Sequence, residues 1–163
     1  MVVATQFKNS FAEGTAAEQE FISLRKDNII RKASRTEDIH QHWDLLDKEF
    51  GKVDVKGPKR KARGDNNVNY KIHWWEFKNV RGRGGWGSPN GIDRYIAFRI
   101  EDSFILVNPD KVNPILETKC TEYYRGMWGL NTRRERNDLI AMIPTDFLLE
   151  HTEHRVYIDG PRA

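Results

Sequence analysis

The alternation of valine with charged residues at positions 53–56 constrains the fold of this chain more than any other feature. Val53 and Val55 are separated by Asp54 and followed by Lys56. Because successive side chains of a strand point to opposite faces, this spacing predicts a strand with one buried face and one charged face. Pro58 ends it, since proline has no N–H for the ladder. We therefore expect Asp54 and Lys56 to share one face of a sheet.

A second alternating stretch precedes this strand. Between residues 39 and 47, His40, His42 and Asp44 occupy every second position. Period-two alternation predicts a strand. A short turn at residues 48–51 then makes a hairpin that brings Asp44 onto the charged face. His40 and His42 would share that face, where they either support a site or lie partly exposed without a role.

A helix is expected before this hairpin. Ala17, Phe21 and Leu24 recur at helical spacing and predict a buried stripe. Thr15 is suited to cap the helix, with Glu18 three residues later as its capping-box partner. Glu18 therefore has two interpretations: it either completes the cap or approaches the hairpin as an additional acidic group.

The rest of the chain continues the mixed pattern. Residues 70–80 predict an aromatic strand, residues 95–100 and 103–107 a hairpin, and residues 108–116 a turn or short helix. The last part mixes strand and helix signals. This order predicts an α/β protein with a mixed, mainly antiparallel sheet flanked by helices.

Length and composition limit the class of protein. With 163 residues, one domain is expected, at residues 14–163, after a loose leader at residues 1–13. We expect no membrane association and a cytoplasmic location, because no apolar run approaches the roughly 20 residues that span a bilayer and no signal peptide is evident. Cys120 is the only cysteine, which suits a reducing cytosol and a packed, unreactive thiol.

The charged residues are segregated along the chain, although the net charge is only +3. Three clusters of basic residues are present. The first contains Lys59, Arg60, Lys61 and Arg63, the second Arg81 and Arg83, and the third Arg133, Arg134 and Arg136. Each cluster alone is typical of a solvated turn. Together in one small domain they favour a polyanion partner, DNA above all, whose phosphates the first cluster would contact beside the charged strand.

The acidic and basic residues of the hairpin match the needs of phosphodiester hydrolysis. That reaction uses a divalent cation to neutralise the phosphate and acidify water. Mg2+ prefers oxygen ligands and retains water, so one or two carboxylates and a carbonyl suffice. Asp44 and Asp54 supply carboxylates, Val55 a carbonyl and Glu18 an auxiliary ligand, while Lys56 activates water. We therefore predict a site for Mg2+ or Mn2+.

Three motifs follow one another in the order helix, strand, strand, and they are Gly14-Thr15-Ala16-Ala17-Glu18, His42-Trp43-Asp44 and Val53-Asp54-Val55-Lys56-Gly57. This pattern resembles the PD-(D/E)XK nuclease superfamily, in particular its small phage-type and Holliday-junction-resolvase-like members. The resemblance covers roughly residues 14–107. It departs at Trp43, where proline is usual, and at Asp54, where glutamate is common; neither change removes the acidic groups.

The resemblance implies a restriction-endonuclease-like core and a metal-dependent DNA endonuclease, that is, a hydrolase. In that family a helix glutamate, a strand aspartate and an acidic-x-lysine pair build the metal site. Carried over, these are Glu18, Asp44, Asp54 and Lys56.

Two further groups compete for roles at the site. Glu76, in a second acidic-x-lysine sequence, either contributes a ligand or positions water, or else forms a salt bridge across the sheet. Trp86 lies in a glycine-rich loop with Arg81 and Arg83. It either stacks on an unpaired base while the arginines contact the DNA backbone, or packs in the core or a dimer interface.

The absence of a recognisable sequence-reading motif favours a structure-selective enzyme, such as a phage-encoded junction resolvase. Two cuts across a symmetric junction imply a homodimer, with Trp75, Phe77 and Trp128 as interface candidates unless the core buries them. A homing, nicking or repair-type endonuclease acting on duplex DNA is one alternative. A non-catalytic nucleic-acid-binding protein with the same fold is another.

Overall fold

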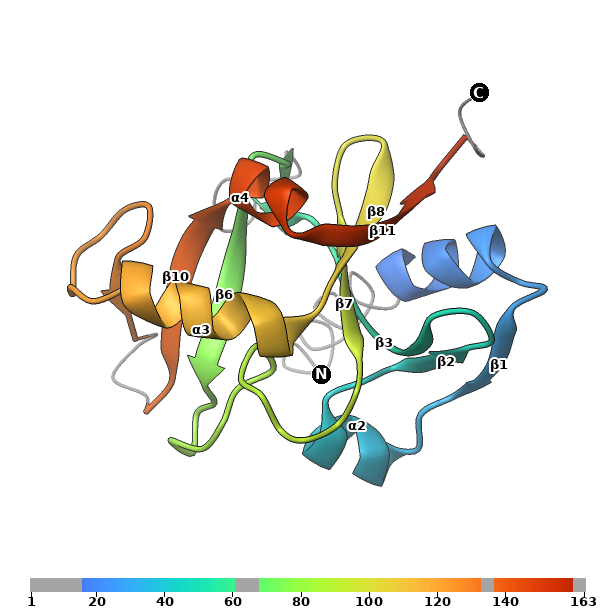
Figure 1. Cartoon of the computed structure of the whole chain (residues 1–163), viewed down its shortest axis with the longest axis horizontal. Coiled ribbons are helices and arrows are strands. Elements are labelled where there is room, and N and C mark those ends of the chain that lie inside the picture. The colour runs from blue at the N-terminus through green and yellow to red at the C-terminus, as the bar shows by residue number, and fades with distance from the viewer. Residues whose placement is uncertain (1–15, 61–67, 133–136, 160–163) are drawn as a thin grey trace, which may run out of the picture.

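The computed structural model describes residues 16–60, 68–132 and 137–159. Within these ranges the chain is an α/β protein with a mixed, mostly antiparallel six-stranded sheet, a second small sheet and four helices (Figure 1). The expected leader and the proposed cap at Thr15 lie outside the described residues. Among the described helices, none is long and apolar enough to cross a membrane.

The large sheet contains, in spatial order, β1 (Ile29–Lys32), β2 (Leu45–Asp47), β3 (Gly51–Lys56), β7 (Tyr95–Arg99), β8 (Ser103–Val107) and β11 (Thr152–Tyr157). Its neighbours pair antiparallel except β3 and β7, which are parallel with Asp54 opposite Ile96. The second sheet contains β6 (Ile72–Lys78), β10 (Leu139–Pro144) and β9 (Leu130–Asn131), and a small ribbon pairs β4 (Lys59–Arg60) with β5 (Val68–Asn69). The helices are residues 16–24, α2 (Arg35–Gln41), α3 (Pro109–Lys119) and α4 (Thr145–Glu150).

The main core lies between the large sheet, the second sheet and the helices α3 and α4. Figure 1 shows α3 running across β6 and β10, and the Nε1 atom of Trp75 donates a hydrogen bond to Oδ1 of Asn113 on α3 at 2.9 Å. Trp75 and Phe77 are 0% and 7% exposed. They therefore belong to the core, and the expectation of a dimer interface at these two residues is wrong. Trp128 is half-buried, with its ring against Phe147.

A smaller core covers the opposite face of the large sheet. Ala17 and Phe21 on the helix at residues 16–24 are buried there, Leu24 packs against them, and the Phe21 ring meets Phe104 edge-on at 5.2 Å. Val53 and Val55 belong to the same cluster. The predicted helix stripe and the predicted alternation of β3 are both confirmed.

The strand predicted for residues 39–47 is wrong over most of its length, because residues 35–41 form α2. The Ser34 hydroxyl accepts a hydrogen bond from the Glu37 backbone at 3.2 Å, and the Glu37 carboxylate accepts one from the Ser34 backbone at 2.9 Å. This capping box nucleates a helix, and its signal outweighs the alternation of polar residues. His42 ends the helix with φ 55°, so the chain turns before β2 begins.

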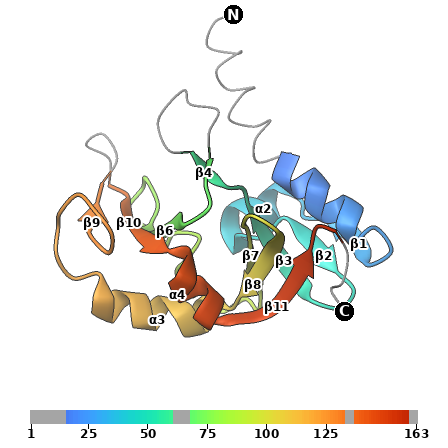
Figure 2. The ribbon, with the colours of Figure 1, turned by 90° about the horizontal axis from the view of Figure 1, so that it is seen from above.

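Other predicted segments agree more closely with the structure. The aromatic strand corresponds to β6, the later hairpin to β7 and β8, and the turn or short helix to α3. The first basic cluster begins on β4, which pairs antiparallel with β5, with Lys59 opposite Asn69. Figure 2 shows β4 standing out from the body of the molecule, between β6 and the β3–β7 pair.

Candidate functional site

One cavity brings together all four residues predicted to be catalytic. Its volume is about 270 Å³, and its lining consists of Glu18, Asp38, His42, Asp44, Asp54, Val55, Lys56 and Trp86. The lining comes from the helix at residues 16–24, from α2 and the segment after it, from β3, and from the loop after β6. Residues far apart in the sequence thus converge where the charged face of β3 is left uncovered.

Asp44 reaches the cavity from the residue that precedes β2, not from within a strand. Its backbone N–H donates to the Val53 carbonyl at 2.8 Å, and its Oδ2 accepts a hydrogen bond from the Val55 N–H at 2.7 Å. The N–H and C=O of one strand residue point to the same neighbour. The Val55 carbonyl therefore lies on the Asp44 side of β3, and Val55 lines the cavity.

The carboxylates of the cavity are crowded and poorly solvated. Burial, followed by the negative charge of Asp54, raises the pKa of Asp44 to about 9. Burial and the same charge raise the pKa of Asp38. Burial also raises the pKa of Glu18, although the Lys32 ammonium, 3.9 Å away, opposes the shift. The fold therefore holds acidic groups together at a cost in electrostatic free energy.

Lys56 supplies a positive charge at the same place. Its Nζ lies 3.3 Å from Oδ1 of Asp54 and 4.6 Å from the centroid of the Trp86 ring. Asp54 is only 4% exposed. The ammonium is thus held between a buried carboxylate and an aromatic face, two positions along β3 from Asp54, as the alternation predicted.

Glu76 fixes the loop that carries Trp86. Its Oε1 accepts a hydrogen bond from the Trp86 N–H at 3.2 Å, and its carbonyl accepts one from the Gly87 N–H at 2.9 Å. The Trp86 ring packs 5.4 Å from Trp75 and 6.0 Å from Phe98. Trp86 therefore packs against the core and also lines the cavity. Glu76 does not line the cavity, but it holds the backbone of Trp86 in place.

Gly87 allows this close packing. A Cβ at that position would lie 2.2 Å from Nε1 of Trp75, a separation that no side chain tolerates. The glycines of this loop therefore bring the backbone against the core, in addition to making it turn.

Asp38 is the acidic residue of the cavity that the sequence reasoning missed. The Ser34–Glu37 capping box was the available signal, because a helix starting there places Asp38 and His42 one turn apart on the same side. His40 lies in the last turn of α2 and is exposed. The expectation that His40 and His42 reach the site together by strand alternation is therefore wrong, and only His42 lines the cavity.

Arg94 is a second charged residue that the sequence reasoning missed. It is 4% exposed, and its Nη2 donates to the Ser88 carbonyl at 3.1 Å, whereas its Nε and Nη1 have no hydrogen-bond partner within the described part of the chain. Burial and then the charge of Arg94 lower the pKa of His42. Arg94 is two residues before Ile96, which lies opposite Asp54, so strand alternation places it on the charged face.

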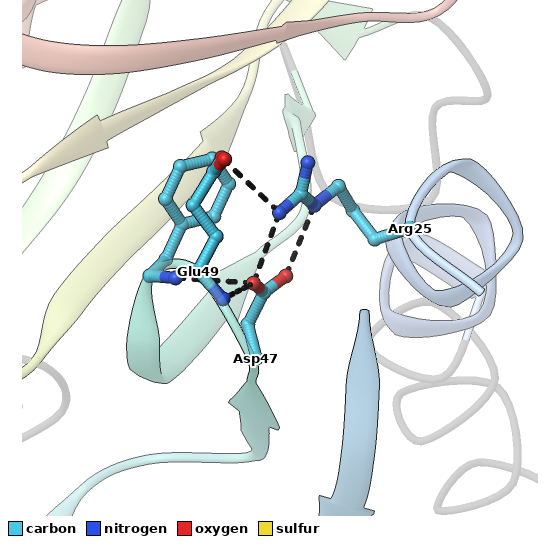
Figure 3. A network of polar contacts seen from close by, with 4 residues as sticks. Arg25, Asp47 and Glu49 are labelled. Atoms are coloured by element: carbon cyan, nitrogen blue, oxygen red, sulfur yellow. Dashed lines mark hydrogen bonds and ion pairs between the residues drawn. The ribbon is translucent and has the colours of Figure 1, made fainter. Parts of the chain in front are cut away.

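A separate ion-pair network anchors the helix at residues 16–24 to the β2–β3 turn (Figure 3). Arg25, just after the helix, donates from Nε and Nη2 to the two oxygens of Asp47, each at 3.0 Å. Oδ1 of Asp47 also accepts the backbone N–H groups of Glu49 and Phe50 at 2.8 and 3.1 Å. This network sets the position of Glu18 relative to the strands that carry Asp44 and Asp54.

The predicted DNA-binding residues are only partly described. Lys59 lies on β4, with its Nζ 5.3 Å from the Trp74 ring centroid. Arg81 and Arg83 are exposed in a turn closed by the Asn79 side chain, whose Oδ1 accepts both of their N–H groups at 3.0 and 3.1 Å. The side chain of Arg60 and all of Lys61, Arg63, Arg133, Arg134 and Arg136 lie outside the described residues.

The donor set of the cavity consists of hard oxygen atoms, which suits Mg2+ or Mn2+. Among the residues that the structure describes, no three His, Cys, Asp or Glu side chains are grouped so as to hold a metal ion by themselves. Mg2+ in proteins is commonly held by one or two carboxylates and several waters, so Asp44, Asp54 and the Val55 carbonyl fit this cation. Comparisons with family models, curated proteins and solved structures return no match to this chain.

Proposed function

We propose that this protein is a metal-dependent DNA endonuclease whose active site is the cavity at the end of β3. The observation that carries the proposal is the convergence of Asp44, Asp54 and Lys56, together with the Val55 backbone, around one cavity. Two neighbouring carboxylates, one buried and one half-buried, beside an ammonium are suited to phosphodiester hydrolysis. The order of these residues is also the one that the PD-(D/E)XK resemblance implies.

Asp44, Asp54 and the Val55 carbonyl are the proposed ligands for Mg2+ or Mn2+. When bound, the cation supplies charge neutralisation at the phosphate and acidifies water. Glu18 and Asp38 also line the cavity. They are placed to hold water molecules around the site as auxiliary acidic groups. Burial and then the charge of Asp54 raise the pKa of Asp44, and a divalent cation attracted by the clustered carboxylates would offset both effects.

Lys56 is the proposed positioning group for the attacking water. Its ammonium donates hydrogen bonds, and contact with Asp54 and the Trp86 ring restricts where Nζ can lie. It therefore orients the water oxygen towards phosphorus and stabilises negative charge that develops on it. His42 accepts or donates hydrogen bonds as a neutral group, because burial and the charge of Arg94 disfavour its protonated form.

The proposed substrate is DNA, with branched DNA ahead of ordinary duplex. The basic side chains of Lys59, Arg81 and Arg83 are suited to phosphate contacts. The sequence contains no recognisable helix-turn-helix or zinc-finger motif, which leaves the shape of the DNA as the proposed basis of recognition. A homodimer that makes two symmetric cuts is part of this proposal.

The test is cleavage of a synthetic four-way junction, a linear duplex and a single strand with Mg2+, Mn2+ or EDTA. We expect metal-dependent cutting that Asp54→Ala and Lys56→Ala each reduce by on the order of 10³-fold, the loss expected for several kcal/mol of transition-state stabilisation. Asp27→Ala and Lys26→Ala, in the exposed turn after the first helix, are matched controls and should cut normally.

Each outcome of this test discriminates between functions. Full metal-dependent cutting by both Asp54→Ala and Lys56→Ala would place the active site elsewhere. DNA binding by the wild-type protein without cutting in either metal would indicate a non-catalytic nucleic-acid-binding protein. Equal rates on junction and duplex would favour a nicking or repair-type endonuclease.

A further inference from the structure

Trp74 is the tryptophan that the fold leaves exposed. The chain has five tryptophans, of which Trp43 and Trp75 are 0% exposed, Trp86 and Trp128 are half-buried and Trp74 is 37% exposed. Alternation along β6 explains the difference, since Trp75 points into the core and Trp74 points away from it. A large aromatic ring is thus presented to solvent in the middle of a strand, where a threonine or lysine would serve the sheet equally well.

A cation accompanies this ring. The Nζ atom of Lys59 lies 5.3 Å from the centroid of Trp74, in the cation–π range. Lys59 begins β4, which contacts β6 (Figure 2). The pair therefore combines an exposed π-face with a positive charge on a long, rotatable side chain. An unpaired base and its phosphate require this combination of groups.

The pair lies next to the proposed active site along the chain and along β6. Lys59 is three residues after Lys56, so their Cα atoms are at most about 11 Å apart. On β6, Trp74 shares its face with Glu76, which holds the backbone of Trp86, and Trp86 lines the cavity. A DNA strand advances about 3.4 Å along the helix axis per nucleotide, so the distance between Lys56 and Lys59 corresponds to a few nucleotides.

We propose that Trp74 and Lys59 form a stacking platform for an unpaired base of the DNA strand that enters the cavity. This inference rests on the proposed function and specifies its substrate class as DNA with single-stranded nucleotides beside the scissile phosphate. Trp74 stacks on the base, and Lys59 moves from the ring to the adjoining phosphate. Bases within a duplex are stacked on one another and cannot occupy the platform, so selection of branched DNA needs no sequence-reading element.

The experiment measures binding of fluorescein-labelled 12-nucleotide single strands and matched duplexes in EDTA, where a metal-dependent enzyme does not cut. Base stacking on an aromatic side chain predicts that Trp74→Ala weakens single-strand binding about tenfold or more. Duplex binding should change less than about twofold, because the platform takes only unpaired bases. Trp74→Phe keeps a ring and should retain most of the affinity, while losing the fluorescence quenching that a stacked base causes in the wild type.

Two further variants complete the design. Lys59→Gln should weaken single-strand binding, because one phosphate contact is lost. The slope of log affinity against log salt concentration should become less negative by about one unit. Ile30→Ala is the control, since Ile30 is 61% exposed on β1, at the far edge of the large sheet, and should bind both DNAs as the wild type does.

The proposal is overturned if Trp74→Ala binds single strands as tightly as the wild type, if it loses single strand and duplex equally, or if the wild type binds no DNA. Circular dichroism and melting of each variant separate misfolding from lost stacking, and Trp74→Phe retains the test if Trp74→Ala misfolds. The readout requires no cutting. Stacking by a protein that never cleaves would therefore support the platform and refute the proposed catalysis, whereas cleavage independent of Trp74 would do the reverse.

Discussion

Asp44 directly precedes the short strand β2 and Asp47 ends it, yet the fold treats their charges in opposite ways. Asp47, 1% exposed, accepts two hydrogen bonds from Arg25 and two from backbone N–H groups. Burial works to raise the pKa of Asp47, but the hydrogen bonds from Arg25 and the backbone outweigh it, so the pKa is lowered. Asp44 accepts one backbone hydrogen bond and faces Asp54, and burial followed by the charge of Asp54 raises its pKa to about 9.

The difference separates an acid that holds the fold together from one available for chemistry. A buried carboxylate with a matched guanidinium is electrostatically satisfied and contributes to stability while it stays ionised. A carboxylate placed against another carboxylate reduces stability in the absence of a cation, and such arrangements are concentrated at functional sites. Position in the sequence does not distinguish the two, because both aspartates adjoin the same strand.

The largest expected effect comes from removing each charge in turn. Asp47→Asn should lower the free energy of unfolding by about 3 kcal/mol, because Arg25 loses its buried, two-point partner and keeps only the exposed carboxylate of Glu49, 3.3 Å away. Asp44→Asn should abolish metal-dependent cleavage but leave the melting temperature unchanged or higher, because it removes a carboxyl group that the folded, metal-free protein must keep protonated far above its ordinary pKa. Denaturant unfolding and the cleavage assay, run on both variants, measure the two quantities.

Arg25→Met is the matching variant on the other side of the ion pair, and it should be destabilising as well, since Asp47 would then be buried alone. The comparison fails if Asp44→Asn unfolds as readily as Asp47→Asn, or if Asp47→Asn cuts no DNA although it is fully folded.

A smaller effect is expected in the pH dependence of stability without metal. The folded protein keeps a proton on Asp44 up to a pKa of about 9, whereas the unfolded chain releases it near pH 4, so the folded state binds more protons in between. Stability should therefore fall as pH rises through this window, by at most about 1.4 kcal/mol per pH unit from this group. Melting temperatures between pH 5 and 8 in EDTA measure the slope.

Asp44→Asn should make that slope less negative, and saturating Mg2+ should do the same for the wild type, because the cation favours the ionised carboxylate. Identical slopes for the wild type and Asp44→Asn would mean that Asp44 ionises normally in the folded protein.

The smallest expected effect concerns the helix that supports one wall of the site. Ser34 caps α2, which carries Asp38 and leads into His42. Ser34→Ala should lower the free energy of unfolding by about 1 kcal/mol, the usual cost of losing an N-cap. Because the first turn of α2 would fray and displace Asp38, cleavage should also require more Mg2+. Ser23→Ala, at an exposed position of the first helix, is the control and should change neither the stability nor the Mg2+ requirement. A metal-titrated cleavage assay and thermal melting test both parts.

Much of the site was predictable because local patterns encode it. The alternation of Val53, Asp54, Val55 and Lys56 determines which side chains share a face, whatever the strand pairs with. The helix stripe of Ala17 and Phe21 likewise identifies its buried side. The family resemblance added an expected endonuclease activity, which the experiments above test.

Other features were missed because one local signal outweighed another, or because they depend on contacts between distant residues. Local alternation suggested a strand at residues 39–47, but the Ser34–Glu37 cap, supported by Arg31 at 2.7 Å from Glu37, makes residues 35–41 helical. That helix brings Asp38 to the cavity. The buried Arg94 lies on the charged face because β7 pairs in parallel with β3, and this pairing cannot be inferred from either strand alone.

The sequence by itself therefore determined the charged face of β3, the buried stripe of the first helix and the type of most elements, because these follow from side-chain periodicity within one segment. Only the tertiary structure decided that Asp47 is neutralised by Arg25 while Asp44 is left facing Asp54, and that Trp74 is exposed while Trp75 is buried. The physical reason is that burial and charge compensation depend on which distant segments pack together. No residue type specifies its partners alone.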